Sequence, residues 1–177
     1  AVLRENSQID AVLRGEGEIS MREYIECILG KREISSADSI TYRNGSEIIS
    51  LPDGKSFVDL NEVPFVYDDS IDEIKNKVIY YETSRGCPYN CTYCLSGEGH
   101  KVRFLSTERV KKELGFFIEK KVPLVKLVDR TFNADIKRAR EIFEFISENP
   151  GDTCFHMELS GDIIDSETLS VLSKVKK

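Results

Sequence analysis

The chain has 177 residues, of which 40% are hydrophobic and 32% charged, a composition that is ordinary for a folded globular protein and excludes a disordered one. Its net charge is -6 and it has no long run of Lys and Arg, so we expect no nucleic acid as a partner. No hydrophobic stretch approaches the roughly 20 residues of a membrane span, and residues 1–10 do not resemble a signal peptide. We therefore expect a cytoplasmic protein that does not contact a membrane.

The first predicted elements are a short strand at 9–13 and a helix from Ser20 to Leu29. Ser20 and Glu23 have the spacing of a capping box, which marks the start of a helix, and Gly30 stands where a left-handed residue would end it. One strand and one helix cannot bury a core by themselves. We interpret this piece as the end of a larger domain.

A β-hairpin is predicted next, because Asn44 and Gly45 separate two strand-like runs at 39–42 and 46–49. The Asn-Gly pair is typical of a two-residue type I′ turn. The stretch from Pro52 to Asp69 then indicates a linker, which leads to a short helix at 71–76.

The remainder of the chain alternates strand and helix patterns, which predicts parallel strands joined by helical crossovers. The expected strands are 78–83, 124–128 and 153–159, and the expected helices are 107–120, 135–147 and one that begins at Asp165 or Ser166. The predicted class is α/β, with a partial TIM-like (β/α) barrel of about three β-α units after a small α/β remnant and a hairpin linker.

Three cysteines directly follow the first of these parallel strands. Cys87, Cys91 and Cys94 have the spacing C-x3-C-x2-C. A structural zinc site would need a fourth ligand nearby, and a disulfide with a spare thiol would need an oxidising compartment. Three thiolates on a 4Fe-4S cluster, in contrast, leave one iron open for chemistry. The loop is therefore interpreted as an iron-sulfur site.

The loop and its surroundings resemble the radical S-adenosylmethionine (SAM) enzymes that carry a cobalamin-binding domain before the barrel. The resemblance depends on three segments: Tyr80 to Pro88 with the cysteine loop, Arg14 to Glu18, and Asp129 to Asn133. It implies an oxidoreductase in which Cys87, Cys91 and Cys94 bind a 4Fe-4S cluster that reductively cleaves SAM to a 5'-deoxyadenosyl radical. An electron donor such as flavodoxin or ferredoxin is also implied.

The same resemblance suggests a division of the chain into three parts. Residues 1–34 correspond to the end of a cobalamin-binding-like, Rossmann-type domain, residues 35–76 to the hairpin and linker, and residues 77–177 to the first half of the radical SAM core. The family's D-x-H-x-x-G cobalt-ligand loop is absent, since neither His100 nor His156 has an Asp two residues before it. Cobalamin stays a possible cofactor whose ligand loop is not in this chain.

Three further residues are predicted to contact SAM. Tyr93 corresponds to the family's aromatic residue that packs over adenine, while Asp129 and Glu158 stand at strand ends, where ligands collect in parallel α/β folds. Cys154, His156 and Glu158 alternate along the third strand and are expected to face the barrel interior. A structural role, such as helix capping or a pair with Arg130, is an equal alternative for the two carboxylates.

The substrate cannot be predicted, because methyl transfer, ring closure and methylthiolation all start from such a loop. The alternative function is a non-catalytic iron-sulfur or metal-binding module for electron transfer or structure. Because the chain starts at Ala1 and holds only about three β-α units, we expect a piece of a longer enzyme that is inactive by itself. Exposed barrel edges are expected to promote self-association.

Overall fold

The computed structural model describes residues 1–54, 57–67, 71–74, 76–94 and 101–175 and confirms the predicted α/β class. The chain forms two compact units, Ala1–Val63 and Pro64–Lys177. The first contains an antiparallel sheet, and the second contains a parallel sheet with helical crossovers. The predicted parts 1–34 and 35–76 therefore contribute strands to the same small sheet.

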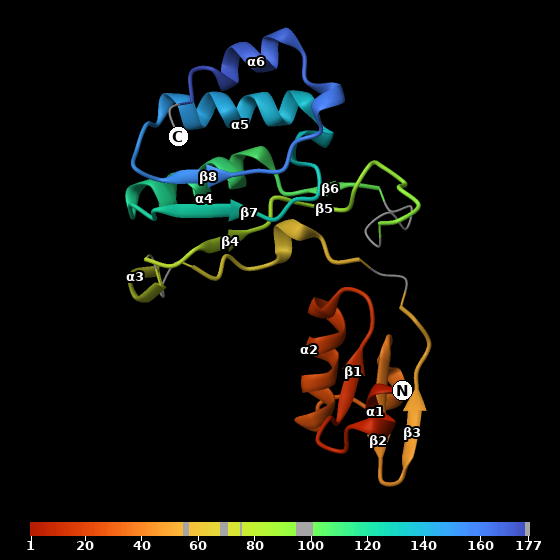
Figure 1. Ribbon diagram of the computed structural model, residues 1–177. Helices are drawn as coiled ribbons and strands as arrows, with labels where there is room; N and C mark the ends of the chain where they lie inside the picture. The colour runs from red at the N-terminus through yellow and green to blue at the C-terminus, as the bar shows by residue number, and fades with distance from the viewer. Residues whose placement is uncertain (55–56, 68–70, 75, 95–100, 176–177) are drawn as a thin grey trace. The chain divides into compact units, whose positions relative to one another are not determined.

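The first unit is a three-stranded antiparallel sheet in the order β1-β2-β3, with helix α2 against β1 (Figure 1). Arg14 connects its strands: its guanidinium donates to Thr41 Oγ1 on β2 and to the Leu51 carbonyl, both at 2.5 Å, and pairs with Asp53 at 2.7 Å. The elements are α1 (Val2–Glu5), β1 (Ala11–Leu13), α2 (Gly17–Ile28), 3-10 turn η1 (Ile34–Ser36), β2 (Ile40–Asn44), β3 (Glu47–Ser50) and η2 (Leu60–Glu62).

Two local predictions in this unit are corrected by the structure. Helix α2 begins at Gly17, so Ser20 lies inside the helix, where its hydroxyl approaches the Glu16 carbonyl at 3.4 Å instead of capping the helix end. In the hairpin Asn44 pairs with Glu47, which leaves Gly45, with φ 60°, and Ser46 as the loop residues. A positive φ at only the first loop residue is typical of a type II′ turn.

The predicted end of α2 is confirmed in detail. Gly30 adopts φ 68°, in the left-handed region that favours glycine. Lys31 N donates to the Glu26 carbonyl at 2.8 Å, and Gly30 N donates to the Cys27 carbonyl at 3.0 Å. These two hydrogen bonds form a Schellman motif, which satisfies carbonyls that the helix end would otherwise leave without a partner.

The second unit contains the three predicted β-α units. Its parallel sheet has the order β4-β7-β8, with Ile79 opposite Val125 and Lys126 opposite His156. The strands are shorter than predicted. The elements are α3 (Ile71–Ile74), β4 (Ile79–Tyr81), β5 (Ser84–Arg85), β6 (Arg103–Phe104), α4 (Thr107–Glu119), β7 (Leu124–Leu127), η3 (Phe132–Ala134), α5 (Ile136–Glu148), β8 (Cys154–His156), η4 (Gly161–Ile163) and α6 (Ser166–Leu172).

Helices cover one face of this sheet. Figure 1 shows α4, α5 and α6 on the same side of β4, β7 and β8, with α5 packed against both α4 and α6. The buried strand residues on that face are Ile79, Tyr81, Val125 and Leu127. The buried helix residues of the same core are Val110, Leu114 and Phe117 of α4 and Ile142 and Phe143 of α5. This apolar burial is the main stabilising contribution to the unit.

The other face of the parallel sheet is open in the described chain. Tyr80 lies on this face with 57% of its surface exposed, and the strand register places it in one row with Lys126 and His156. Cys154, His156 and Glu158 are all exposed, as the predicted alternation of β8 requires. The sheet therefore has one apolar, covered face and one face that presents polar side chains.

A buried hydrogen-bond network connects β4 to α4. The Tyr81 hydroxyl donates to Glu113 Oε2 at 2.6 Å, and Arg109 Nε donates to Glu113 Oε1 at 2.7 Å. Burial is the main cause that raises the pKa of the Tyr81 phenol, and its bond to Glu113 raises it further. The phenol therefore stays protonated and donates its hydrogen to the carboxylate.

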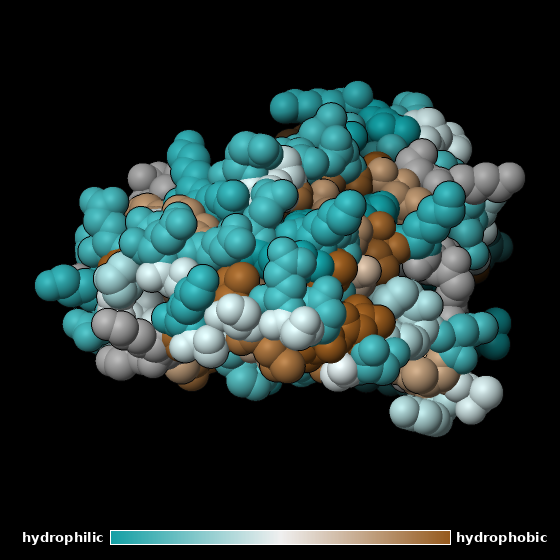
Figure 2. Space-filling view, turned by 90° about the horizontal axis from the view of Figure 1, so that it is seen from above, coloured by the Kyte–Doolittle hydropathy of each residue, from teal (hydrophilic) through white to brown (hydrophobic). Residues whose placement is uncertain are grey.

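The surface seen in Figure 2 is mostly hydrophilic, with smaller hydrophobic patches between the charged side chains. Among the described residues, no helix combines the length and hydrophobicity that crossing a membrane requires.

The Glu113→Ala variant is expected to lower the free energy of unfolding by about 1–3 kcal/mol, because it leaves the buried Tyr81 hydroxyl without an acceptor. Urea unfolding monitored by circular dichroism measures this change. The matched control is Glu119→Ala on the exposed side of the same helix, which should change stability by less than about 0.5 kcal/mol. Equal effects of the two substitutions would contradict the role of the network.

Candidate metal and cofactor site

A two-stranded clamp closes the base of the cysteine loop. Ser84 on β5 pairs with Phe104 on β6 in antiparallel register, so the loop begins and ends at the same place. Between β5 and Cys87, Gly86 has φ 108°, a conformation that L side chains rarely adopt. The backbone therefore turns at Gly86, directly before the first cysteine of the loop.

The three cysteines are differently exposed. Cys87 is half-buried, whereas Cys91 and Cys94 are exposed, and Cys94 N donates to the Cys91 carbonyl at 3.0 Å across a tight turn. None of the five cysteines, all of which lie in the described chain, is in a disulfide. No three Cys, His, Asp or Glu side chains in the described ranges are close enough to hold a metal ion, so the three-cysteine ligand set stays a prediction.

The carboxylate of Asp129 holds the start of the loop. Its Oδ1 accepts hydrogen bonds from the backbone N–H groups of Thr83 and Ser84, both at 2.7 Å, and its Oδ2 accepts from Thr83 Oγ1 at 2.5 Å. Only 1% of Asp129 is exposed. Its predicted contact with SAM stays a prediction, since the structure gives the carboxylate a structural role at the strand end.

The charge on Asp129 is partly balanced by a buried arginine. Burial raises the pKa of the Asp129 carboxyl, while its hydrogen bonds and the nearby Arg138 act in the opposite direction. Arg138 Nη2 donates to the Thr83 carbonyl at 3.0 Å, and its guanidinium lies 4.9 Å from the centre of the Phe104 ring. The backbone N–H and the carbonyl of Thr83 are thus each hydrogen-bonded to a buried side chain.

Two more contacts anchor the loop region. Cys87 Sγ lies 3.5 Å from Thr131 Oγ1. The Tyr89 hydroxyl lies 2.7 Å from Ser160 Oγ and donates to Asp162 Oδ1 at 2.9 Å. The hydrogen bonds that Asp162 accepts from the Ser160 and Tyr89 hydroxyls lower the pKa of its carboxyl. The cysteine loop is therefore connected to the segments that follow both β7 and β8.

The segment after β7 is itself locked to the segment after β8. Asn133 is fully buried; its Nδ2 donates to the Ser160 carbonyl and its Oδ1 accepts from Ser160 N, both at 2.8 Å. In addition, Phe132 N donates to the Glu158 carbonyl at 2.9 Å. These bonds hold two strand ends side by side at the edge of the sheet where the loop begins.

The other two predicted SAM-binding residues are accessible. Tyr93 is 89% exposed, and Glu158 is exposed on the open face beyond the end of β8. No salt bridge between Glu158 and Arg130 occurs among the described residues. Their positions leave both side chains available for a ligand, and their SAM contacts stay predictions.

Sequence reasoning did not assign roles to Thr131, Asn133, Tyr89 or Arg138. For Thr131 and Asn133 a signal was present, since they lie in the segment Asp129 to Asn133 that carried part of the resemblance. No comparable signal exists for Arg138, whose guanidinium reaches the loop from helix α5 only through the tertiary fold.

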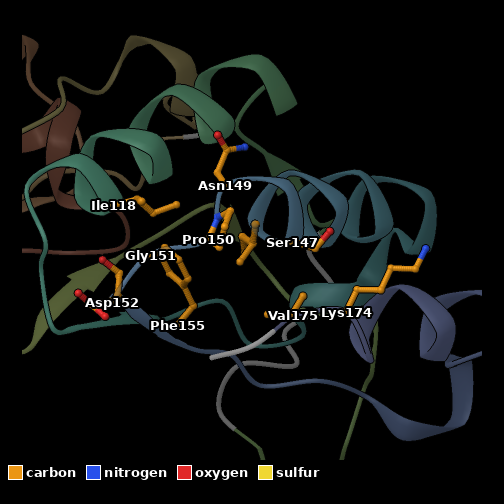
Figure 3. Close-up of a pocket in the computed structure, with 11 residues that line it drawn as sticks. Ile118, Ser147, Asn149, Pro150, Gly151, Asp152, Phe155, Lys174 and Val175 are labelled. Carbon is orange, nitrogen blue, oxygen red and sulfur yellow. The ribbon is translucent and has the colours of Figure 1, made fainter.

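A cavity of about 150 Å³ lies at the opposite end of the sheet. It is lined by Ile118 near the end of α4, the turn from Ser147 to Asp152, the start of β8, and Lys174 and Val175 (Figure 3). The cavity lies where β8 begins, whereas the cysteine loop follows the carboxyl end of β4, so the two sites are separate. Ligands in parallel α/β folds collect at the carboxyl ends of the strands, which favours the cysteine site.

The family model described as the radical SAM superfamily matches residues 81–177, which contain the last residue of β4, the cysteine loop and all the elements that follow it. The chain belongs to the radical SAM superfamily. Its predicted resemblance is thereby confirmed, and the residues that the match covers include the Asp129 to Asn133 segment.

Two methyltransferases are similar to most of the chain. An uncharacterized methyltransferase of Pyrococcus horikoshii is 32% identical over 148 residues, which cover 79% of this chain and 32% of that protein. The cobalamin-dependent radical SAM methyltransferase TokK of Streptomyces tokunonensis is 26% identical over 81% of this chain and 23% of its own length. The chain thus spans about a third or less of these relatives.

The fold also resembles a solved member of the superfamily. The radical SAM methyltransferase TsrM from Kitasatospora setae, whose structure holds cobalamin and a [4Fe-4S] cluster, aligns with a TM-score of 0.73 at 15% sequence identity. The alignment covers 98% of this chain and 37% of TsrM. At this identity the likeness shows a shared fold.

The Asp129→Ala variant is expected to lower the free energy of unfolding by about 3 kcal/mol, because the buried N–H groups of Thr83 and Ser84 lose their acceptor. The Asp129→Asn variant is the control: its side-chain oxygen still accepts both N–H groups, and its amide can donate to Thr83 Oγ1. Urea unfolding compares the two. An Asn variant as unstable as the Ala variant would show that charge, not hydrogen bonding, stabilises the loop start.

A comparison of the wild type with the Asp129→Asn variant also tests the electrostatics of Asp129. Its pKa is higher in the folded chain than in the unfolded chain, so the folded state binds the proton more tightly. The contribution to stability is therefore present below about pH 4, the ordinary value for Asp, and is lost as pH rises through the folded pKa. Relative to the Asp129→Asn variant, the wild type should lose unfolding free energy as pH increases across this window.

Proposed function

We propose that this chain is the cluster-binding part of a cobalamin-dependent radical SAM methyltransferase. One observation carries the proposal: a C-x3-C-x2-C loop leaves the carboxyl end of the first strand of a parallel α/β sheet, within the superfamily match. Methyl transfer is favoured over ring closure because both relatives described above are named methyltransferases. The three β-α units would form part of the (β/α) barrel.

Cys87, Cys91 and Cys94 would hold a 4Fe-4S cluster. The donor set fits, since all three are outside any disulfide and two of the thiols are exposed, while the third lies next to a hydroxyl group, as metal ligands often do. The separate thiols in the described loop are compatible with a site that metal binding itself assembles. When bound, such a cluster supplies the electron for reductive cleavage of SAM.

The residues of the chain divide into those that hold the loop and those that face the ligand. Asp129 and Arg138 fix the peptide of Thr83 at the loop start. Tyr93 would pack over the adenine of SAM, and Glu158 would accept hydrogen bonds from SAM at the end of β8. The substrate would lie over the open face of the sheet, near the row of Tyr80, Lys126 and His156.

The D-x-H-x-x-G motif for cobalt ligation is absent from these 177 residues, so cobalamin is proposed as a cofactor whose ligand loop is not in this chain. Residues 1–34 are proposed to correspond to the end of the cobalamin-binding domain. We also propose a flavodoxin- or ferredoxin-type electron donor, a cytoplasmic location, and self-association through the outer edges of β4 and β8, which pair with no further strand in the described chain.

Anaerobic reconstitution of the wild type should load about four irons and four sulfides per chain. The Cys87→Ala, Cys91→Ala and Cys94→Ala variants should each lose most of this iron, because each removes one of only three protein ligands. Iron content and the visible absorbance of the cluster measure the effect. Addition of dithionite and SAM to the loaded wild type should then produce little 5'-deoxyadenosine, because the chain supplies only about three β-α units of the barrel that holds SAM.

Cys27→Ala and Cys154→Ala are the matched controls, because these residues lie in α2 and β8, outside the loop. Both variants should load iron as the wild type does. If Cys154→Ala abolishes loading as fully as Cys91→Ala, the three-ligand site is wrong.

Replacement of Tyr93 tests its predicted contact with adenine. The Tyr93→Ala variant should load iron normally but bind SAM about tenfold more weakly, since an aromatic stacking contact contributes about 0.5–1.5 kcal/mol. The change that SAM causes in the electron paramagnetic resonance (EPR) spectrum of the reduced protein reports the Kd. The Tyr93→Phe variant keeps the ring and should bind like the wild type; equal weakening in both variants would contradict stacking.

A further inference from the structure

The hydroxyl of Thr131 lies against the first cysteine of the loop. Its Oγ1 is 3.5 Å from Cys87 Sγ, and only 5% of Thr131 is exposed. Thr131 stands at the start of η3, where a Thr hydroxyl commonly accepts a backbone N–H group, but it makes no such capping bond. Within the described ranges, the only hydrogen-bond partner of this hydroxyl is Cys87 Sγ.

The backbone around Thr131 is fixed on both sides. Asp129 is bound to Thr83 and Ser84, and Phe132 N donates to the Glu158 carbonyl at 2.9 Å. Asn133 is locked onto Ser160 by its two hydrogen bonds. The hydroxyl of Thr131 is therefore held by a rigid, buried segment, in contrast to the exposed Cys91 and Cys94 on the outer part of the loop.

We propose that Thr131 is a positioning residue that donates a hydrogen bond to the Cys87 thiolate and thereby raises the reduction potential of the bound cluster. This inference rests on the proposed function. In the metal-free chain either atom can donate, but a thiolate bound to iron has lost its proton, so the direction becomes Oγ1–H to Sγ.

The physical reason is electrostatic. When the cluster accepts one electron from a reductant such as dithionite, negative charge increases on its sulfur ligands. A hydrogen bond to a ligand sulfur stabilises the more negative state, and such bonds are one of the factors that set the potential of iron-sulfur sites. Loss of the Thr131 hydroxyl should therefore shift the midpoint potential to a more negative value.

The test compares Thr131→Val, which keeps the branched shape but loses the hydroxyl, with Thr131→Ser, which keeps the hydroxyl. Each reconstituted protein is titrated anaerobically with dithionite in the absence of SAM, and EPR spectroscopy follows the reduced cluster. Thr153→Val is the matched control, because Thr153 is equally buried and donates to the Phe117 carbonyl at the opposite end of the sheet. Iron content is measured for every protein.

We expect a more negative midpoint potential for Thr131→Val and wild-type potentials for Thr131→Ser and Thr153→Val. A fully loaded Thr131→Val protein with the wild-type potential would overturn the proposal. If Thr131→Val loses iron, full loading of Thr131→Ser supports the hydroxyl contact, and loss in both variants overturns it. The proposed function fails separately, when the wild type itself loads no cluster.

Discussion

The cysteine loop depends on the buried carboxylate of Asp129, which accepts the backbone N–H groups of Thr83 and Ser84 at the point where β4 ends. A strand that ends inside a protein leaves backbone groups that need partners, and water cannot reach these two. With Arg138 on the carbonyl side, the Thr83 peptide is held from both directions. The place where the loop leaves the sheet is therefore set by buried hydrogen bonds, while the outer loop stays open to a ligand.

The segment from Asp129 to Asn133 serves three purposes with alternate residues. Asp129 binds the loop start, Thr131 contacts Cys87, and Asn133 binds the segment after β8. Phe132, between them, is fully buried and packs against Phe143 of α5, with 5.4 Å between the ring centres. One short connection thus links the loop, the helix layer and the neighbouring strand end, and a change in its packing would reach all three.

The two faces of the parallel sheet explain how the fold separates stability from chemistry. Apolar residues on one face pack under α4 and α5, and the network of Tyr81, Glu113 and Arg109 adds specific contacts there. The other face presents Tyr80, Lys126 and His156 in one row without a covering helix in the described chain. Residues on that face contribute little to the core, so they are available for ligand recognition.

Local sequence determined the order and type of the main elements and the position of the cysteine loop, because the periodicity of apolar residues and the C-x3-C-x2-C spacing depend on neighbours in the chain. The end of α2 at Gly30 was predictable for the same reason, since it depends on the backbone freedom of one residue. The helix start at Gly17 and the turn at Gly45 were not predicted: α2 begins three residues before Ser20, and the register of β2 and β3 pairs Asn44 with Glu47 and so moves the turn by one residue.

The contacts that hold the site were decided only by the tertiary structure. Thr83 and Asp129 are 46 residues apart, and Thr83 and Arg138 are 55 residues apart, so no local pattern relates them. Parallel strands bring their carboxyl ends together only after the intervening helix has packed on the sheet. That packing buries Asp129 next to the N–H groups that it accepts, and it places Thr131 beside Cys87. The surroundings of the first cysteine therefore depend on the packed fold.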